Sequence, residues 1–397
     1  MVSINQISFF CILNSLLSPA ILTLPHNFKE SGTHWSVIII ALVSILSLVL
    51  SLMLIEIHCK AQHLISAQES GQDLTVNVSS IFKAQVKIQP GSQTTLLSDT
   101  RTDTLQCLFL IFGKPVGCIL SFLSFIIFQV ILTQSYITFA STLAGLIPIQ
   151  PLEPCQILSE DLSLTPCRLL YVLYLLLFVI FQYNYLKQGL AHQGKMQLAC
   201  SVFSVTIIVL TIVACFSAIF LQSSLKSNLY RELPKLPAYN IKRTTRILSN
   251  SCILLMIQAQ IGTIFQELNK PEHFVRQVFS GILASSGLMV TLCFAVSLAS
   301  DESLGNFTED FIGFTAGHNL ENRPLYAFFL SYGIMALPAA LSMSSAGVMG
   351  STALSNFRSL LRVFNLTSPL YSNISLSAFT MLPFLLALFC PDLVRFT

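Results

Sequence analysis

The first apolar stretch of the chain contains residues that would interrupt a membrane helix. It reads from Asn14 through Ser18, Pro19 and Ala20, and reaches a second proline at Pro25. Proline lacks an N–H group and its ring clashes with the preceding helical turn, so we expect a break near Pro19. In lipid, the freed backbone groups are tolerated only where protein buries them or a polar cavity receives them. Such a break can offer N–H groups to an anion and carbonyl groups to a cation.

The sixth apolar stretch, LLMIQAQIGTIFQEL, carries a second set of polar residues, with Gln258 and Gln260 inside an apolar run. Segments one and six correspond if a five-helix unit repeats, and an odd-numbered unit inserts its second copy in inverted orientation. Paired interruptions of this kind are typical of inverted-repeat transporters, which bind their substrate between the breaks. The alternative is a simple proline kink in segment one and ordinary interhelical glutamine hydrogen bonds in segment six.

Composition indicates an integral membrane protein. Of the 397 residues, 53% are hydrophobic and 10% are charged, whereas soluble proteins carry roughly 25% charged residues. Mean hydropathy is +0.73. The range 37–55 is apolar or small over about the ~20 residues that cross a bilayer. The net charge is +3 without a basic run, so nothing suggests a nucleic-acid partner. The N-terminus lacks a basic region and a cleavage site, so we expect the first segment to remain as a membrane helix.

The pattern predicts an all-α polytopic membrane protein with one transmembrane domain over 1–397. A first five-helix repeat covers 1–222, with a polar loop at 57–106, and a second, incomplete repeat covers 247–397. With the N-terminus in the cytoplasm, the polar loop is cytoplasmic, but Lys and Arg residues are nearly balanced between the two sides. Nine apolar segments carry the prediction: 4–27, 36–56, 113–146, 168–186, 197–222, 247–266, 277–299, 326–350 and 372–390.

Segment one resembles the opening motif of the amino acid/auxin permease family, roughly N-x-x-x-G-x-G-I-L-x-L-P, at residues 14–25. The following NFKESG is similar to the family's continuation. Segment six, IQAQIGTIFQELNKPEH, resembles the family's sixth helix and ends in Glu267-Leu268. Segment three and the C-terminal LLALFCPDLVRF match more loosely. The resemblance implies a leucine-transporter-like inverted-repeat helix bundle that transports amino acids, coupled to Na⁺ or H⁺ and without any other cofactor.

Three departures from the family pattern affect this expectation. Ser18 and Ala20 occupy the two glycine positions, so the pocket is expected to be narrower. About nine of the family's eleven helices are present. The eighth helix, which carries the family's sodium site, is difficult to align, although Ser342, Ser344 and Ser345 could offer hydroxyl groups there.

The resemblance and the breaks together place an amino acid between segments one and six. Backbone N–H groups at the first break would bind its carboxylate, while released carbonyls and the glutamines would bind its ammonium. This arrangement needs no Arg or Lys at mid-membrane, where a charge costs at least ~2.5–3.5 kcal/mol. The predicted substrate-binding residues are Asn14, Ser18, Pro19, Ala20, Gln258 and Gln260. For gating or coupling we expect Glu267, Ser344 and Ser345, although Glu267 could equally be an interfacial residue in water.

Enzymatic activity is not expected. The sequence contains no Gly-x-Ser-x-Gly motif, no Cys/His cluster with metal-ligand spacing and no phosphate-binding glycine loop. Cys155 and Cys167 lie in one polar loop, where a disulfide could form if the loop faces an oxidising compartment. Asn306 begins an Asn-Phe-Thr sequence that could be glycosylated on the outer side.

The expected function is therefore amino acid transport by alternating access, in the plasma membrane or a vacuolar or lysosomal membrane. Two alternatives remain open. The chain could be an amino acid sensor or receptor that retains the site without the transport cycle, or a structural membrane subunit that requires a partner.

Overall fold

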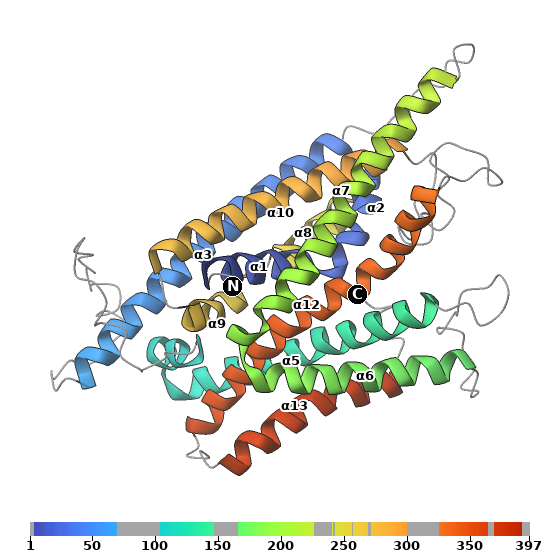
Figure 1. The fold of residues 1–397 in the computed structure, drawn as a ribbon. Helices are drawn as coiled ribbons and strands as arrows, with labels where there is room; N and C mark the ends of the chain where they lie inside the picture. The colour runs from blue at the N-terminus through green and yellow to red at the C-terminus, as the bar shows by residue number, and fades with distance from the viewer. Residues whose placement is uncertain are drawn as a thin grey trace.

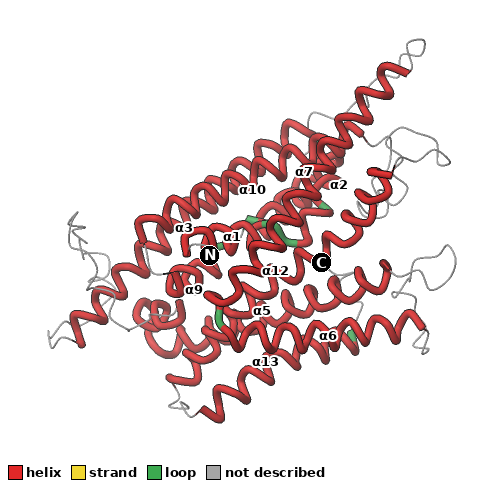
Figure 2. Tube along the Cα trace, viewed as in Figure 1, coloured by secondary structure: helices red, strands yellow, loops and turns green. Residues whose placement is uncertain are grey.

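The computed structural model describes residues 4–69, 104–146, 166–225, 240, 243–255, 257–268, 271–299, 325–363 and 369–390. Every regular element in these ranges is helical, and all nine apolar segments predicted above form helix (Figures 1 and 2). The elements are α1 (Ile4–Leu16), η1 (Pro19–Leu22), α2 (Leu24–Ser31), α3 (Thr33–Glu69), α5 (Thr104–Leu146), α6 (Pro166–Gln188), η2 (Leu190–Gln193), α7 (Gly194–Leu225), α8 (Thr244–Leu254), α9 (Gln258–Leu268), α10 (Pro271–Ala299), α12 (Leu325–Val363) and α13 (Pro369–Phe389).

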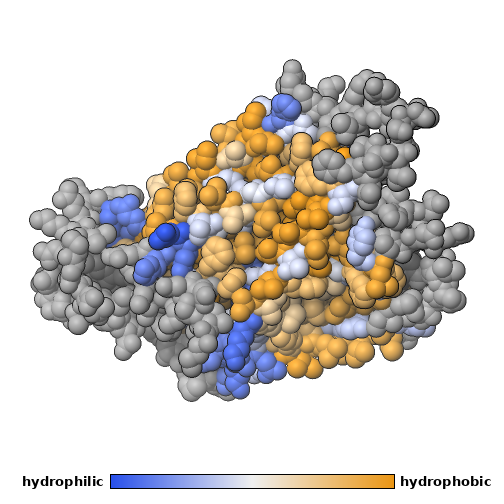
Figure 3. Space-filling model, turned by 45° about the horizontal axis from the view of Figure 1, so that its top comes forward, coloured by the Kyte–Doolittle hydropathy of each residue, from blue (hydrophilic) through white to orange (hydrophobic). Residues whose placement is uncertain are grey.

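Within the described residues, six helices are long and apolar enough to cross a membrane: α3, α5, α6, α7, α10 and α12. Their outward faces carry large apolar side chains, such as Leu42 at 61% exposure and Leu283 at 64%. Figure 3 shows an apolar surface that extends across the face drawn. A soluble protein rarely exposes so large an apolar area, so the fold is that of a polytopic membrane protein.

The predicted interruption of segment one is confirmed. Helix α1 ends at Leu16, Ser18 is extended (φ −89°, ψ 167°), and the short 3₁₀ helix η1 begins at Pro19. Pro19 has no N–H to offer the carbonyl of Ser15, four residues earlier, so the α-helical ladder stops there. Thr23 then separates η1 from α2.

The predicted interruption of segment six is also confirmed, but it contains neither proline nor glycine. Helix α8 ends at Leu254, and the Leu255 N–H donates to the carbonyl of Ser251 (3.0 Å). The N–H of Ile257 then donates back to the carbonyl of Leu255 (3.0 Å), and α9 begins at Gln258. A bond between residues two apart closes a γ-turn. The spacing of the hydrogen bonds therefore changes from four residues to two, which interrupts the α-helical pattern before α9.

The helices pack in two groups. The first group contains α1, α2, α3, α8, α9 and α10, and the second contains α5, α6, α12 and α13 (Figure 1). Helix α7 contacts both, through α1 and α10 on one side and α12 on the other. In terms of the apolar segments, the first group is made of segments one, two, six and seven, and the second of three, four, eight and nine.

The polar loop is shorter than the predicted 57–106. Residues 57–69 continue α3 as regular helix, and α5 begins at Thr104. No Pro or Gly interrupts the chain between His58 and Glu69, and many of these residues favour helix, so α3 continues beyond its apolar portion. At the other end, Gly113 adopts φ 78° within α5, a conformation that only glycine adopts freely, and it kinks the helix before Pro115.

Candidate functional site

Asn14 is fully buried in the last turn of α1 and faces α7. Its Nδ2 donates to the carbonyl of Gln197 (2.9 Å) and to the Gln197 Oε1, and its Oδ1 accepts from the Ser201 hydroxyl (2.7 Å). The side chain is thus committed to protein partners. Asn14 contributes to the site by fixing α1 against α7 on one side of the first break.

Gln197 extends this junction to two more helices. Its Nε2 donates to the hydroxyl of Tyr185 on α6 (3.2 Å) and to the carbonyl of Ser344 on α12 (3.0 Å). The close approach requires a glycine on α12, because a Cβ on Gly347 would lie 2.3 Å from the Tyr185 ring and 3.2 Å from the Gln197 amide. Four helices therefore meet at one buried amide. Gln197 and Ser201 are not predicted from the sequence, since each is one polar residue in an ordinary apolar segment.

Ser18, Pro19 and Ala20 form the first break as predicted. The carbonyl of Ser18 accepts from the Ile21 N–H (3.0 Å), and the carbonyl of Ala20 accepts from both the N–H (3.2 Å) and the hydroxyl of Thr23 (2.9 Å). Ser18 itself makes no side-chain cap. The backbone carbonyls of Ser18 and Ala20 therefore have hydrogen-bond donors within η1 and at Thr23. The last carbonyls of α1 lack the N–H donors that a further helical turn would supply.

Gln258 connects the second break to α3 through Ser47. Its Nε2 donates to the hydroxyl (3.0 Å) and to the carbonyl (3.2 Å) of Ser47, and the same hydroxyl donates to the freed carbonyl of Leu255. The Leu255 carbonyl therefore accepts two hydrogen bonds, one from the Ile257 N–H and one from the Ser47 hydroxyl on α3. Gln258 lies at the predicted break, but its amide is directed toward α3.

Replacing Ser47 by Ala is expected to destabilise the protein by about 1 kcal/mol, because the change removes one of the two donors to the Leu255 carbonyl and one of the acceptors of the Gln258 amide. The thermal midpoint in detergent measures the effect. A matched control is Ser217→Ala, since the Ser217 hydroxyl donates to the Val213 carbonyl of its own helix (2.8 Å). Equal midpoints for the two variants would show that Ser47 does not support the break.

Of the buried polar atoms beside the breaks that have no hydrogen-bond partner among the described residues, three lie on helices around the first break. They are Oε1 of Gln260 on α9, the hydroxyl of Ser204 on α7 and the hydroxyl of Ser342 on α12. Their exposed fractions are 2%, 0% and 0%. A buried polar group normally has a partner, so these atoms are candidates for contact with a ligand.

The three atoms belong to helices that surround the first break. Ile7 lies against Gly194 and Asn14 against Ser201, so α1 and α7 run in the same direction and Ser204 lies level with the end of α1. Helix α12, which carries Ser342, contacts both α1 and η1.

Gln260 follows Gln258 by two residues, about 200° around α9. It therefore faces away from α3, on the side where α9 contacts α1, α12 and η2. Of the predicted binding residues, Gln260 is the one whose side-chain oxygen is fully buried and has no partner among the described residues.

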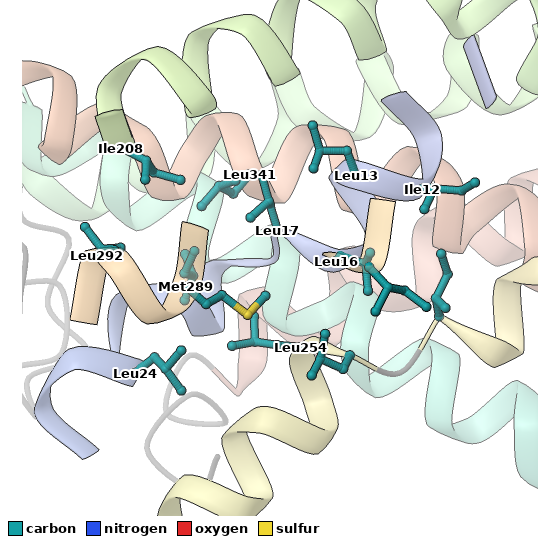
Figure 4. Packing of buried hydrophobic residues seen from close by; sticks show 14 of the residues in the cluster. Ile12, Leu13, Leu16, Leu17, Leu24, Ile208, Leu254, Met289, Leu292 and Leu341 are labelled. Atoms are coloured by element: carbon teal, nitrogen blue, oxygen red, sulfur yellow. The ribbon is translucent and has the colours of Figure 1, made fainter. Parts of the chain in front are cut away.

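Apolar side chains fill the region between the two breaks in this conformation. Figure 4 shows Leu16 and Leu17 in one cluster with Leu254 of α8, Met289 of α10 and Leu341 of α12. A polar ligand would enter only after some of these side chains separate. The structure thus has closed packing around the candidate site.

A group of charged residues ties α2 to α8 beyond the breaks. Glu30 accepts from Nη1 of Arg243 and from Nη1 of Arg246 (2.9 Å), and His26 Nε2 lies 3.7 Å from the same carboxylate. Asn250 on α8 also donates to the Thr23 hydroxyl (2.9 Å). The second half of segment one and the first half of segment six are therefore held together as one unit.

Replacing Glu30 by Gln is expected to lower the free energy of unfolding by about 1 kcal/mol at low salt, because a surface charge network loses its only carboxylate among these contacts. The loss should shrink in 1 M salt, where the Debye length is about 3 Å. Glu56→Gln is the control, since Glu56 pairs with Lys60 one turn along the same helix (2.7 Å) and should matter less. Salt-independent loss in the Glu30 variant would contradict the ionic explanation.

The predicted gating residues are placed as follows. Ser344 and Ser345 are buried on α12, and their hydroxyls donate to the carbonyls of Leu341 (3.0 Å) and Ser342 (3.4 Å) of the same helix. Their oxygens retain acceptor capacity toward a cation. Glu267 lies near the end of α9, and its side chain is outside the described structure, so its role stays a prediction.

The predicted disulfide is only half described. Cys167, at the start of α6, is disulfide-bonded, but Cys155 lies outside the described residues, as does Asn306. The pairing of the two cysteines therefore stays a prediction. Among the described residues no group of three or more His, Cys, Asp or Glu side chains could hold a metal ion.

Comparisons of the sequence with models of protein families and with curated proteins found no match. The family resemblance therefore depends on the motifs of segments one and six.

Proposed function

We propose that the protein is a secondary active transporter that carries amino acids across a membrane by alternating access. The observation that carries the proposal is the pair of helix breaks in segments one and six, surrounded by buried polar atoms that have no partner among the described residues. Breaks in a membrane helix are costly and are typical of transporter binding sites.

The composition of the two helix groups supports an inverted repeat. Segments one and two pack with six and seven, and segments three and four pack with eight and nine. Each group therefore combines two helices with the pair that follows five positions later. This is the arrangement expected if 1–222 and 247–397 are two copies of a five-helix unit, the second incomplete and inverted, as in the leucine-transporter-like fold that the motif resemblance suggests.

The chemistry at the breaks suits a zwitterion. Helix α1 presents its carbonyl end at the first break, which favours an ammonium group, and α9 presents its N-terminal end at the second, which favours a carboxylate. The amide oxygen of Gln260 and the hydroxyls of Ser204 and Ser342 would add hydrogen bonds. Ser344 and Ser345 are the residues we propose for contact with a coupling Na⁺, with coupling to H⁺ as the alternative.

Alternating access would follow from the two groups of helices. The group that contains both breaks would move relative to α5, α6, α12 and α13, with the junction of Asn14 and Gln197 breaking or reforming between them. The proposed location is the plasma membrane or a vacuolar or lysosomal membrane.

A sensor or receptor remains the second candidate, because Ser18 and Ala20 replace the family's glycines and leucines fill the region between the breaks. Uptake of radiolabelled amino acids into proteoliposomes containing this chain alone separates the candidates. Uptake above empty liposomes supports transport. Saturable binding without uptake supports the sensor, and absence of both supports a subunit that requires a partner.

A further inference from the structure

Two glutamines outside the candidate site are buried with no partners. Gln129 on α5 is 3% exposed and Gln182 on α6 is 1% exposed. Neither the amide nitrogen nor the amide oxygen of either side chain has a hydrogen-bond partner in the described part of the chain. Four polar atoms left without partners in one group of membrane helices are unusual, because buried polar groups are nearly always satisfied by protein or ordered water.

Gln182 lies beside Gly350 of α12, and Gln129 follows Phe125 by one turn on the side of α5 that meets α12. The rings of Phe125 and Phe357 are 5.2 Å apart, and α5 and α12 run in opposite directions (Figure 1). On α5, Gln129 comes one turn after Phe125. The level of Gly350 on α12 is reached one further turn along α5. The Nε2 of Gln182 lies 3.6 Å from the position that a Cβ on Gly350 would occupy. The two amides are thus separated along α12 by about one helical turn, roughly 5.4 Å.

The charges of the surrounding helices decide what can bind between them. Helices α5, α6, α12 and α13 contain no Asp or Glu and carry several Lys or Arg residues. A cation would have no countercharge there, and a lipid chain could not satisfy an amide. A water molecule can accept from one carboxamide and donate to the other. Two such bonds of ~2.9 Å each span the separation.

We propose that one or two water molecules are bound between Gln129 and Gln182, beside Gly350. A buried water typically makes about three hydrogen bonds to polar groups that would otherwise lack partners. The site continues a polar region along α12, because Gln193 donates to the Ser351 hydroxyl (3.3 Å) and to the Tyr185 carbonyl (3.0 Å). The bound water fixes the rotation of α5 and α6 against α12, whether or not the protein transports a substrate.

The first test is a double-mutant cycle with Gln129→Leu, Gln182→Leu and the double variant. Each single change leaves the other amide and the water without a partner, so each should lower the thermal midpoint. The double variant replaces both amides by apolar groups and should recover most of the loss. Additive midpoint shifts would show that the two glutamines do not share a ligand and would overturn the proposal.

The second test uses the native sequence. Pulsed radiolytic hydroxyl labelling with mass spectrometry oxidises side chains next to bound water, and Met349 is adjacent to Gly350. We expect the oxidation of Met349, which is partly buried, to fall in the double variant, while that of Met289, which is 1% exposed in the other apolar cluster, stays low in both proteins. Protection of Met349 equal to that of Met289, or oxidation unchanged in the double variant, would overturn the proposal. So would a midpoint that rises with Na⁺ or K⁺ only when both glutamines are present, which would assign the site to a cation.

Discussion

Asn14→Leu is expected to lower the free energy of unfolding by roughly 2–4 kcal/mol and to abolish uptake. The change leaves Oε1 of Gln197 without its donor and removes the acceptor of the Ser201 hydroxyl, and each buried polar group without a partner costs about 1–3 kcal/mol. The junction that joins α1 to α7 and, through Gln197, to α12 would be lost. The midpoint of thermal unfolding in detergent measures the stability, and proteoliposome uptake measures the activity.

Asn184→Leu is the matched control for this variant. Asn184 is exposed on α6 and donates to the Ile180 carbonyl of its own helix (3.0 Å). Its replacement removes the same functional group without disturbing a contact between helices. If Asn14→Leu and Asn184→Leu shift the midpoint equally, the Asn14 junction does not hold the helices together.

Gln260→Leu is expected to have the opposite profile, with a normal or raised thermal midpoint and a 10–100-fold weaker affinity for the amino acid that best stabilises the native protein. The Gln260 oxygen has no partner among the described residues, so removing it sacrifices no bond of the resting structure. In the bound state the amide would contact a charged group of the ligand, and such a hydrogen bond contributes about 1.5–3 kcal/mol.

Gln258→Leu separates this prediction from a general effect of removing a glutamine from α9. Because Gln258 bonds Ser47 at the second break, its replacement should lower the midpoint whether or not a ligand is present. If Gln260→Leu destabilises the protein as much as Gln258→Leu does and leaves ligand affinity intact, Gln260 is structural and the proposed site is wrong.

The interruption of segment one could be predicted from the sequence because its cause is local, and that of segment six because amides stand in its apolar run. Pro19 removes a donor in the middle of an apolar run, and Gln258 and Gln260 place amides where a lipid-facing helix would carry apolar side chains. The structure adds that the second break needs a distant residue. Ser47, 211 residues from Gln258, donates a second hydrogen bond to the Leu255 carbonyl, and nothing near Leu255 in the sequence signals it.

The direction of each polar side chain could not be predicted. Asn14 bonds Gln197, 183 residues away, and Gln258 bonds Ser47, so both amides that the motif places at the breaks face supporting helices. Which face of α1 or α9 meets a neighbour depends on the packing of the whole bundle. Ser204 was missed for the same reason, because one serine in an apolar segment is normally an unremarkable packing residue until its neighbours are known.

The central claim is that a small zwitterion binds between the two breaks. The most direct measurement is thermal stabilisation of the purified protein by each of the twenty amino acids, with and without Na⁺ and at two pH values. Binding to the folded state raises its stability by about 2.7 kcal/mol at a hundredfold excess over Kd. We predict a raised midpoint for one chemical class of amino acids, dependent on Na⁺ or pH and lost in Gln260→Leu. A well-folded protein whose midpoint responds to no amino acid under any of these conditions would contradict the claim.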